Sequence, residues 1–230
     1  MKKLKQFINY FTKFEKILWS VSVILILSAF IFLENNGVLT LIATIIGITA
    51  LLFNAKGNPI GPLLIIVFSI LYGIISFTFR YYGEMVTYLG MSMPMAVVSL
   101  ITWLRNPYKG KKSQVTVNAI KKKELIFLSI LSVVVTVIFY FILKHFGTAN
   151  LIISSLSIFT SFIAAYLTFR RSPFFALAYA INDLVLIVMW ILASLKSLGY
   201  VSVIICFAIF LVNDSYTFIS WLRMQKKQAE

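Results

Sequence analysis

The sequence predicts an all-α membrane protein with eight transmembrane helices, in which an N-terminal helix precedes two triple-helix repeats joined by one connecting helix. Composition indicates the class, because 60% of the residues are hydrophobic, 12% are charged and the mean hydropathy is +0.95. Such values lie far outside the range of soluble domains. The apolar runs give the number of helices, and the basic residues give their orientation.

The apolar runs have the lengths that membrane helices need. A hydrocarbon core roughly 30 Å thick requires about 17 to 25 apolar residues per helix. Eight runs reach or approach that length: 17–33, 38–53, 60–79, 85–104, 125–143, 151–169, 174–195 and 200–222. The segments between them are too short for a soluble catalytic domain, so any ligand must bind among the helices or in short loops.

Basic residues define the orientation, because Lys and Arg are retained in short loops on the cytoplasmic side. With both chain ends inside, 18 of the 21 basic residues lie on the cytoplasmic side, and only Arg80, Lys144 and Lys196 lie outside. If the first run instead lay flat on the outer surface, only 13 basic residues would lie on the cytoplasmic side and 8 would lie outside. We therefore expect eight spans with cytoplasmic termini. The net charge of +14 suits anionic membrane lipids rather than nucleic acid.

An internal repeat divides the chain. Ile-Thr-Trp-Leu-Arg at 101–105 matches Ile-Ser-Trp-Leu-Arg at 219–223, and Pro59 matches Pro173 with nearly the same offset. Because one helix separates the two copies, they have the same orientation in the membrane. The alternative is that Trp-Leu-Arg is only an interfacial anchor. The predicted units are a cytoplasmic stub with the first helix (1–37), the first repeat (38–104), a basic cytoplasmic loop with the connecting helix (105–150), the second repeat (151–222) and a cytoplasmic tail (223–230).

Two acidic residues lie in the middle of apolar runs, and they predict a transporter. Asp183 and Asp214 are each directly preceded by an asparagine, Asn182 and Asn213. A charge at bilayer depth costs at least about 2.5 kcal/mol, so it normally faces a polar cavity and marks a pathway or a binding site. In the first repeat, Pro94 predicts a local break in the fourth helix, which is tolerated where the helix lines protein or water.

Helical spacing places aromatic side chains beside the first of these acids. Residues four and seven apart share a helix face, so Tyr179, Asp183 and Trp190 project together, with Asn182 beside them. Asn213 and Asp214 lie on neighbouring faces of the last run. A purely structural role is the alternative, in which the amides join helices by hydrogen bonds and the aromatic rings fill the core.

Four sequence features resemble the PnuC family of bacterial vitamin transporters. They are the Trp-Leu-Arg repeat ends, Tyr-Gly-Glu-Met at 82–85, Ala-Tyr-Ala-Ile-Asn-Asp at 178–183 and Asn-Asp-Ser-Tyr at 213–216. The resemblance covers nearly the whole chain. It implies a three-plus-one-plus-three fold like that of the SWEET sugar transporters, a homotrimer in the bacterial cell membrane, and facilitated diffusion of nicotinamide riboside, which cytoplasmic phosphorylation then traps. Many family members carry a tryptophan pair at the positions that match Ala176 and Tyr179, which leaves the exact substrate open.

The residue types suit such a ligand. A nicotinamide ring is flat and cationic, so aromatic rings can stack on it and a carboxylate can balance its charge, while amides and hydroxyls can bind the ribose. The candidate binding residues are Tyr72, Tyr179, Asn182, Asp183, Trp190, Asn213, Asp214 and Tyr216. Thiamine, riboflavin or a deoxynucleoside remain alternative substrates, and thiamine would satisfy most of the same groups.

Two other classes of function compete with a facilitative carrier. Asp183 and Asp214 could relay protons in an ion-coupled transporter, although no intramembrane Lys, Arg or His completes the relay. An intramembrane hydrolase would need a Ser–His pair, a metal-binding His pair or aspartates in glycine-flanked motifs. The chain has one histidine, His145, in an outer loop, and neither aspartate has the glycine pattern. We therefore expect no enzyme, no metal and no cofactor.

Overall fold

The computed structural model describes residues 10–33, 38–78, 80–195 and 201–230 of the chain. It contains eight helices that are long and apolar enough to cross a membrane, which confirms the predicted fold class. They are α2 (Lys13–Leu33), α3 (Val38–Ala55), α4 (Ile60–Thr78), a composite helix (Tyr82–Arg105), α7 (Lys122–His145), α8 (Leu151–Phe169), α9 (Phe174–Ser194) and α10 (Val201–Ala229). Phe79 and Tyr200, at predicted run ends, and Lys196 lie outside the described residues.

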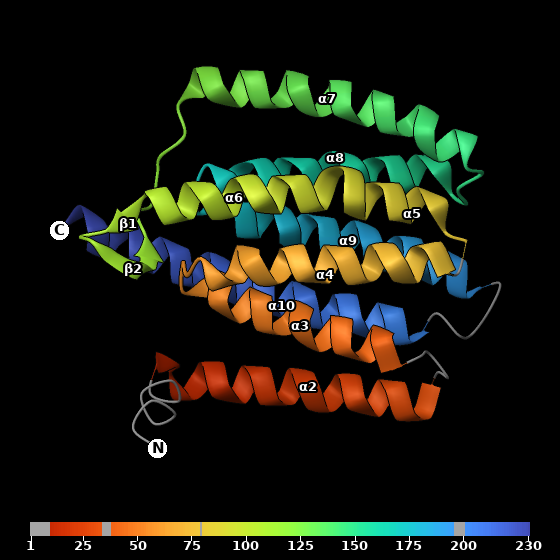
Figure 1. Ribbon diagram of the computed structural model, residues 1–230, viewed down its shortest axis with the longest axis horizontal. Coiled ribbons are helices and arrows are strands. Elements are labelled where there is room, and N and C mark those ends of the chain that lie inside the picture. Colours follow the sequence, from red (N-terminus) through yellow and green to blue (C-terminus); the bar gives the residue numbers. More distant parts are fainter. Residues whose placement is uncertain (1–9, 34–37, 79, 196–200) are drawn as a thin grey trace.

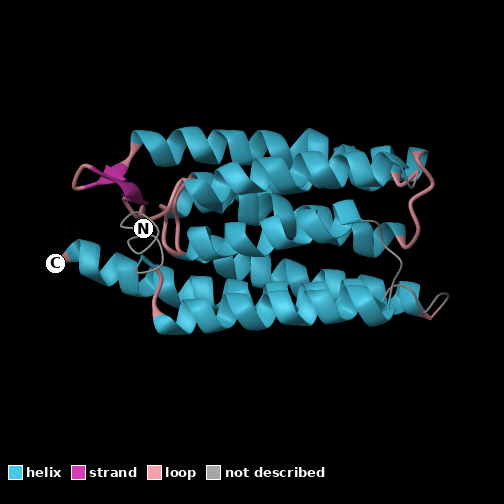
Figure 2. Ribbon diagram, turned by 60° about the horizontal axis from the view of Figure 1, so that its bottom comes forward, coloured by secondary structure: helices cyan, strands magenta, loops and turns pink. Residues whose placement is uncertain are grey.

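The helices lie side by side with their axes roughly aligned and consecutive spans running in opposite directions (Figures 1 and 2). Helix α2 lies at one edge of the bundle and α7 at the other. Between these edges, α9 packs on α8 and α10, α3 packs on α4 and α10, and α4 packs on the composite helix. The beginning of α2 and the end of α10 lie at the same end of the bundle, beside a small β-hairpin (Figure 1). We call this the hairpin end.

The fourth span is irregular at the position where the sequence predicts a break. It consists of α5 (Tyr82–Thr87), a π-helix η1 (Tyr88–Ser92) and α6 (Met93–Arg105). Pro94 is the second residue of α6. Proline has no N–H to donate and its ring clashes with the carbonyl four residues earlier, so the widened π-turn that precedes it absorbs the clash.

The basic loop after the fourth span contains the β-hairpin, which the sequence analysis did not predict. Strands β1 (Pro107–Tyr108) and β2 (Lys111–Val115) pair antiparallel. The backbone N–H of Val115 donates to the carbonyl of Gly57 at 2.9 Å, and that of Asn118 donates to the carbonyl of Arg171 at 3.0 Å. The loop therefore joins the α3–α4 turn to the α8–α9 turn.

These two turns have the same geometry. Gly57 and Arg171 both adopt a left-handed backbone, with φ values of 63° and 58°. The N–H of Gly57 donates to the carbonyl of Asn54 and the N–H of Arg171 to that of Thr168, each at 2.9 Å. Gly57 is separated in sequence from Arg171, and Asn54 from Thr168, by the same number of residues as Pro59 from Pro173. This correspondence supports the predicted repeat.

Candidate functional site

A cavity of about 320 Å³ lies between the two triple-helix units. Residues of α3, α4 and the composite helix line one side of it, and residues of α8, α9 and α10 line the other. Most lining residues are apolar, and the polar ones are concentrated at a few positions. A concave apolar site with a few convergent polar groups is typical of a small-molecule site.

The charged groups of this cavity are all acidic. Glu84, Asp183 and Asp214 line it, and no Lys, Arg or His does so among the described residues. The whole chain has only 7 acidic residues against 21 basic ones. In the part of the chain that the structure describes, no three His, Cys, Asp or Glu side chains are grouped as a metal site would require. The acidic lining therefore favours a positively charged ligand.

Asp183 and Asp214 form the centre of this acidic lining. Asp183 is the tenth residue of α9 and Asp214 is near the middle of α10, and these two helices pack along each other. Their side chains are 4% and 3% exposed and interact directly with each other. Asp183 Oδ2 and Asp214 Oδ1 have no hydrogen-bond partner among the described atoms. Two adjacent carboxyl groups at this depth require a shared proton or a bound cation.

Asn182, Tyr179 and Trp190 line the same wall of the cavity. The Asn182 Oδ1 atom accepts hydrogen bonds from Thr160 Oγ1 at 2.7 Å and from Ser157 Oγ at 3.3 Å. Asn182 therefore joins α9 to α8 and also faces the cavity. The structural role and the position for ligand binding that its sequence context suggests are thus compatible. Tyr179 lies within electrostatic range of both aspartates.

The opposite wall carries an aromatic cluster formed by Phe68, Tyr72 and Tyr88, all of which line the cavity. The ring centroids of Phe68 and Tyr72 are 4.5 Å apart, and those of Tyr72 and Tyr88 are 5.2 Å apart. The Tyr72 hydroxyl lies 3.2 Å from Thr44 Oγ1. Tyr72 is among the binding residues predicted from the sequence, whereas Tyr88 and Glu84 are not. For Glu84, its place in the 82–85 motif was the signal that could have indicated a role in the site.

Asn213 and Tyr216 lie away from the cavity, on the side of α10 that packs against α2. Asn213 Nδ2 donates to Ser22 Oγ at 3.2 Å, and the Tyr216 hydroxyl donates to Glu15 Oε1 at 2.9 Å. Glu15 is 1% exposed and also pairs with Lys56 Nζ at 3.1 Å. The structure thus brings six of the eight candidate residues to one cavity and places these two in the α2–α10 contact.

Buried aromatic residues lie next to the cavity at the hairpin end. Trp103, Trp221 and Phe175 are among the fully buried side chains. The Trp103 indole N–H donates to the carbonyl of Thr168 at 2.8 Å, and the Trp221 indole N–H donates to the carbonyl of Asn54 at 2.7 Å. Thr168 and Asn54 themselves line the cavity. The tryptophans therefore lie directly below its floor.

Comparison with known families identifies the chain. A family described as nicotinamide mononucleotide transporter matches residues 37–223. The chain belongs to this PnuC-type transporter family. It is a multi-pass membrane transport protein rather than an enzyme.

Individual members support the assignment over most of the chain. The chain is 24% identical over 209 residues to the nicotinamide riboside transporter PnuC of Neisseria mucosa, covering 88% of this chain and 79% of that protein. A crystal structure of the vitamin B3 transporter PnuC superposes with a TM-score of 0.79 at 24% identity, covering 95% of this chain and 94% of the other. The resemblance predicted from the motifs is therefore confirmed, and the fold is that of PnuC.

Proposed function

We propose that this chain carries nicotinamide riboside across the bacterial cell membrane by facilitated diffusion. The observation that carries the proposal is the charge of the cavity, which has three carboxyl groups and no basic side chain among its described lining residues. The nicotinamide ring of the riboside bears a fixed positive charge. A cation of this kind supplies the positive charge that Asp183 and Asp214 require.

The same charge pattern favours the riboside over its mononucleotide. The family description names the mononucleotide, whereas the name of the Neisseria mucosa relative specifies the riboside. A phosphate monoester carries about −1.5 to −2 charges at pH 7. Bound phosphates are normally held by Arg, Lys or helix N-termini. In this cavity the phosphate would face carboxylates instead, so the mononucleotide should bind far more weakly.

Each group on the cavity wall has a defined part in this proposal. Asp183 and Asp214 balance the ring charge, and Tyr179 and Trp190 stack on the ring from the same wall. Asn182 uses its remaining amide hydrogens to bind ribose hydroxyls. Tyr72 supplies an aromatic face from the opposite wall.

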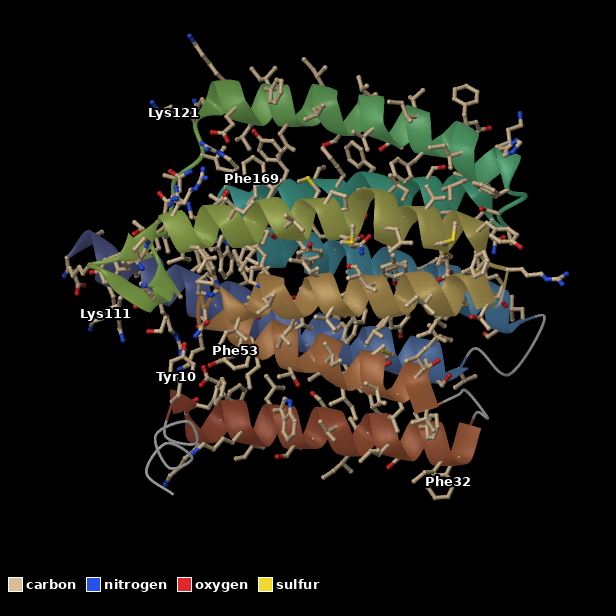
Figure 3. All side chains as sticks on the ribbon, viewed as in Figure 1. Tyr10, Phe32, Phe53, Lys111, Lys121 and Phe169 are labelled. Carbon is tan, nitrogen blue, oxygen red and sulfur yellow. The ribbon has the colours of Figure 1, made fainter. Side chains whose placement is uncertain are left out.

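The proposed direction of transport rests on the basic residues. Lys111 and Lys121 lie at the hairpin end, whereas Phe32 lies at the opposite end (Figure 3). The basic residues of the described hairpin-end segments far outnumber those at the other end, where only Arg80 and Lys144 are described. By the positive-inside rule, the hairpin end and both termini are cytoplasmic. Riboside that leaves at this end is trapped when a cytoplasmic kinase phosphorylates it, because the product no longer suits the acidic cavity.

A proton-coupled carrier is the second candidate, and the direct contact between Asp183 and Asp214 favours it. A pair that shares a proton when empty and releases it when a cation binds would couple the two ligands. The coupled carrier would accumulate riboside against its gradient when a proton gradient is imposed. The facilitative carrier would only equilibrate it.

A binding screen of the purified protein tests the substrate. Nicotinamide riboside, nicotinamide mononucleotide, thiamine, riboflavin and deoxynucleosides would each be titrated by calorimetry. The proposal predicts saturable binding of the riboside and at least tenfold weaker binding of the mononucleotide. Preferred binding of the mononucleotide, or of an uncharged nucleoside, would overturn it. The homotrimer that the resemblance implies is also a proposal, which the mass of the detergent-solubilised protein would test.

A further inference from the structure

We propose that Ser69 is a ligand-binding residue of the first repeat, and that its hydroxyl holds the carboxamide of the nicotinamide ring. The inference rests on the proposed function and adds to it a specificity-determining residue that the sequence did not indicate. The proposed function gives the ring charge to Asp183 and Asp214 and the ribose to Asn182. It leaves the carboxamide, the remaining polar group of the riboside, without a partner.

Ser69 occupies in the first repeat the place that Asp183 occupies in the second. The two residues are separated in sequence by the same number of residues as Pro59 and Pro173. Each is the tenth residue of its helix, Ser69 of α4 and Asp183 of α9. Both helices begin at the turns that the hairpin loop joins, so both residues lie about 14 Å along their helices from that end. They therefore line opposite walls of the cavity at a similar depth.

The Ser69 hydroxyl has no partner in the described part of the protein. Ser69 is buried and lines the cavity, yet its Oγ atom makes no hydrogen bond to any described atom. By contrast, the hydroxyls of Thr168 and Ser132, which are also buried in helices, each donate to the carbonyl four residues earlier, at 2.8 and 2.7 Å. An unpaired buried hydroxyl costs free energy, so its presence beside a cavity indicates that a bound group completes it.

The other unpaired groups of the cavity are either charged or covered by a helix. The described cavity-lining residues with an unpaired buried polar atom are Asp183, Asp214, Asn54 and Ser69. The unpaired Oδ1 atom of Asn54 lies against Gly61 of α4, in the place that a Cβ atom of that residue would take. That oxygen therefore packs on the helix backbone. Ser69 is left as the neutral group that can bind a ligand from this wall.

Ser69 lies beside the aromatic rings of its own wall. Phe68 directly precedes it, and Tyr72 follows three residues later, so Ser69 and Tyr72 share one face of α4. The Phe68 and Tyr72 rings pack against each other on this face. A flat ring that stacks on Tyr72 therefore has the Ser69 hydroxyl one helical turn below it. A hydroxyl and a carboxamide both donate and accept hydrogen bonds, so the two groups can pair without a charge.

The test compares two ligands that differ only in the carboxamide. Nicotinamide riboside carries it, whereas pyridinium riboside lacks it and keeps the positive charge and the ribose. Calorimetric titration of the purified wild type and of Ser69→Ala with both ligands gives a complete cycle of affinities. The proposal predicts that Ser69→Ala weakens the binding of nicotinamide riboside about three- to tenfold and leaves that of pyridinium riboside unchanged. Equal wild-type affinities for the two ligands, or a variant that changes neither affinity or both equally, would overturn it.

Thermal unfolding in detergent separates this role from a structural one. Ser69→Ala removes a hydroxyl without a protein partner, so the empty variant should unfold at the wild-type temperature or above it. The matched control is Ser220→Ala, which removes a hydroxyl that donates to the Ala55 carbonyl at 2.7 Å, outside the cavity. The control should lower the unfolding midpoint and change neither affinity. A midpoint of Ser69→Ala as low as that of the control would overturn the binding role. A wild type that binds neither riboside would instead overturn the proposed function.

Discussion

Trp103 and Trp221 face each other at the floor of the cavity, with ring centroids 5.4 Å apart. Each indole N–H crosses to the other repeat, where Trp103 donates to the Thr168 carbonyl and Trp221 to the Asn54 carbonyl. Thr168 and Asn54 are the equivalent residues of the two helix-ending turns. The pair therefore joins the two repeats symmetrically, next to the cavity residues Thr168 and Asn54.

Removing one of these indole donors should destabilise the protein. Trp221→Phe removes one of the two donors to the Asn54 carbonyl, which keeps the Gly57 N–H, and the loss of such a buried hydrogen bond costs about 0.5 to 1.5 kcal/mol. We expect a clear drop in the thermal unfolding midpoint in detergent, and a similar drop for Trp103→Phe. The control is Trp19→Phe, which removes a part-buried indole bond to Thr49. Midpoints equal to that of the control would contradict a structural link between the repeats.

Neutralising Asp183 should weaken the binding of the riboside without loss of stability. Asp183→Asn removes a charge-assisted contact worth about 1.5 to 3 kcal/mol, which corresponds to roughly ten- to a hundredfold in affinity. The same change relieves repulsion from Asp214, so the empty protein should be at least as stable as the wild type. Calorimetric titration and thermal unfolding measure the two effects separately. Unchanged affinity would assign Asp183 a purely structural role.

Tyr216→Phe should give the opposite pattern. Its hydroxyl donates to the buried Glu15 carboxylate at 2.9 Å and lies in the α2–α10 contact, away from the cavity. Loss of this bond should lower stability by about 1 to 3 kcal/mol, while the affinity for the riboside stays within twofold of the wild type. A selective loss of affinity would show that Tyr216 contributes to the site, as its sequence context suggested.

The orientation can be tested by reporters. A fusion to Glu230 should be active with a cytoplasmic reporter, and an insertion at Gly147, after the opposite end of α7, should be active with an external one. The distribution of basic residues is the physical reason. The same signal from both sites would disprove the predicted arrangement, because three spans, α8, α9 and α10, lie between the two sites and an odd number of crossings places them on opposite sides.

The helices were predictable because contact with lipid requires a long apolar run for each span, and such runs are visible in the sequence. The β-hairpin was not, because its segment is polar and is held by hydrogen bonds to distant parts of the chain, from Val115 N–H to the Gly57 carbonyl and from Gln228 Nε2 to the Val115 carbonyl. Those bonds depend on three-dimensional placement, which the local sequence does not show. A basic segment between two spans has the same composition whether or not it pairs into strands.

The site was predictable in part, for a related reason. Helical spacing shows which residues share a face, and it correctly grouped Asp183 with Tyr179 and Trp190 on one wall. It does not show which neighbour that face meets. Asn213 and Asp214 are adjacent in sequence, yet Asp214 faces the cavity and Asn213 faces α2. Glu84 could be placed from the sequence near the outer mouth of the first repeat, but only the structure shows that its side chain lines the cavity.

The central claim, facilitated diffusion of the riboside with trapping by phosphorylation, is tested most directly in proteoliposomes. Labelled nicotinamide riboside is supplied outside, and the internal concentration is followed to its plateau with and without proton or sodium gradients. We predict a plateau at the external concentration in every case, and total internal label well above it when a riboside kinase and ATP are enclosed. Accumulation above the external concentration in kinase-free vesicles with an imposed ion gradient would contradict the claim and favour coupling through Asp183 and Asp214.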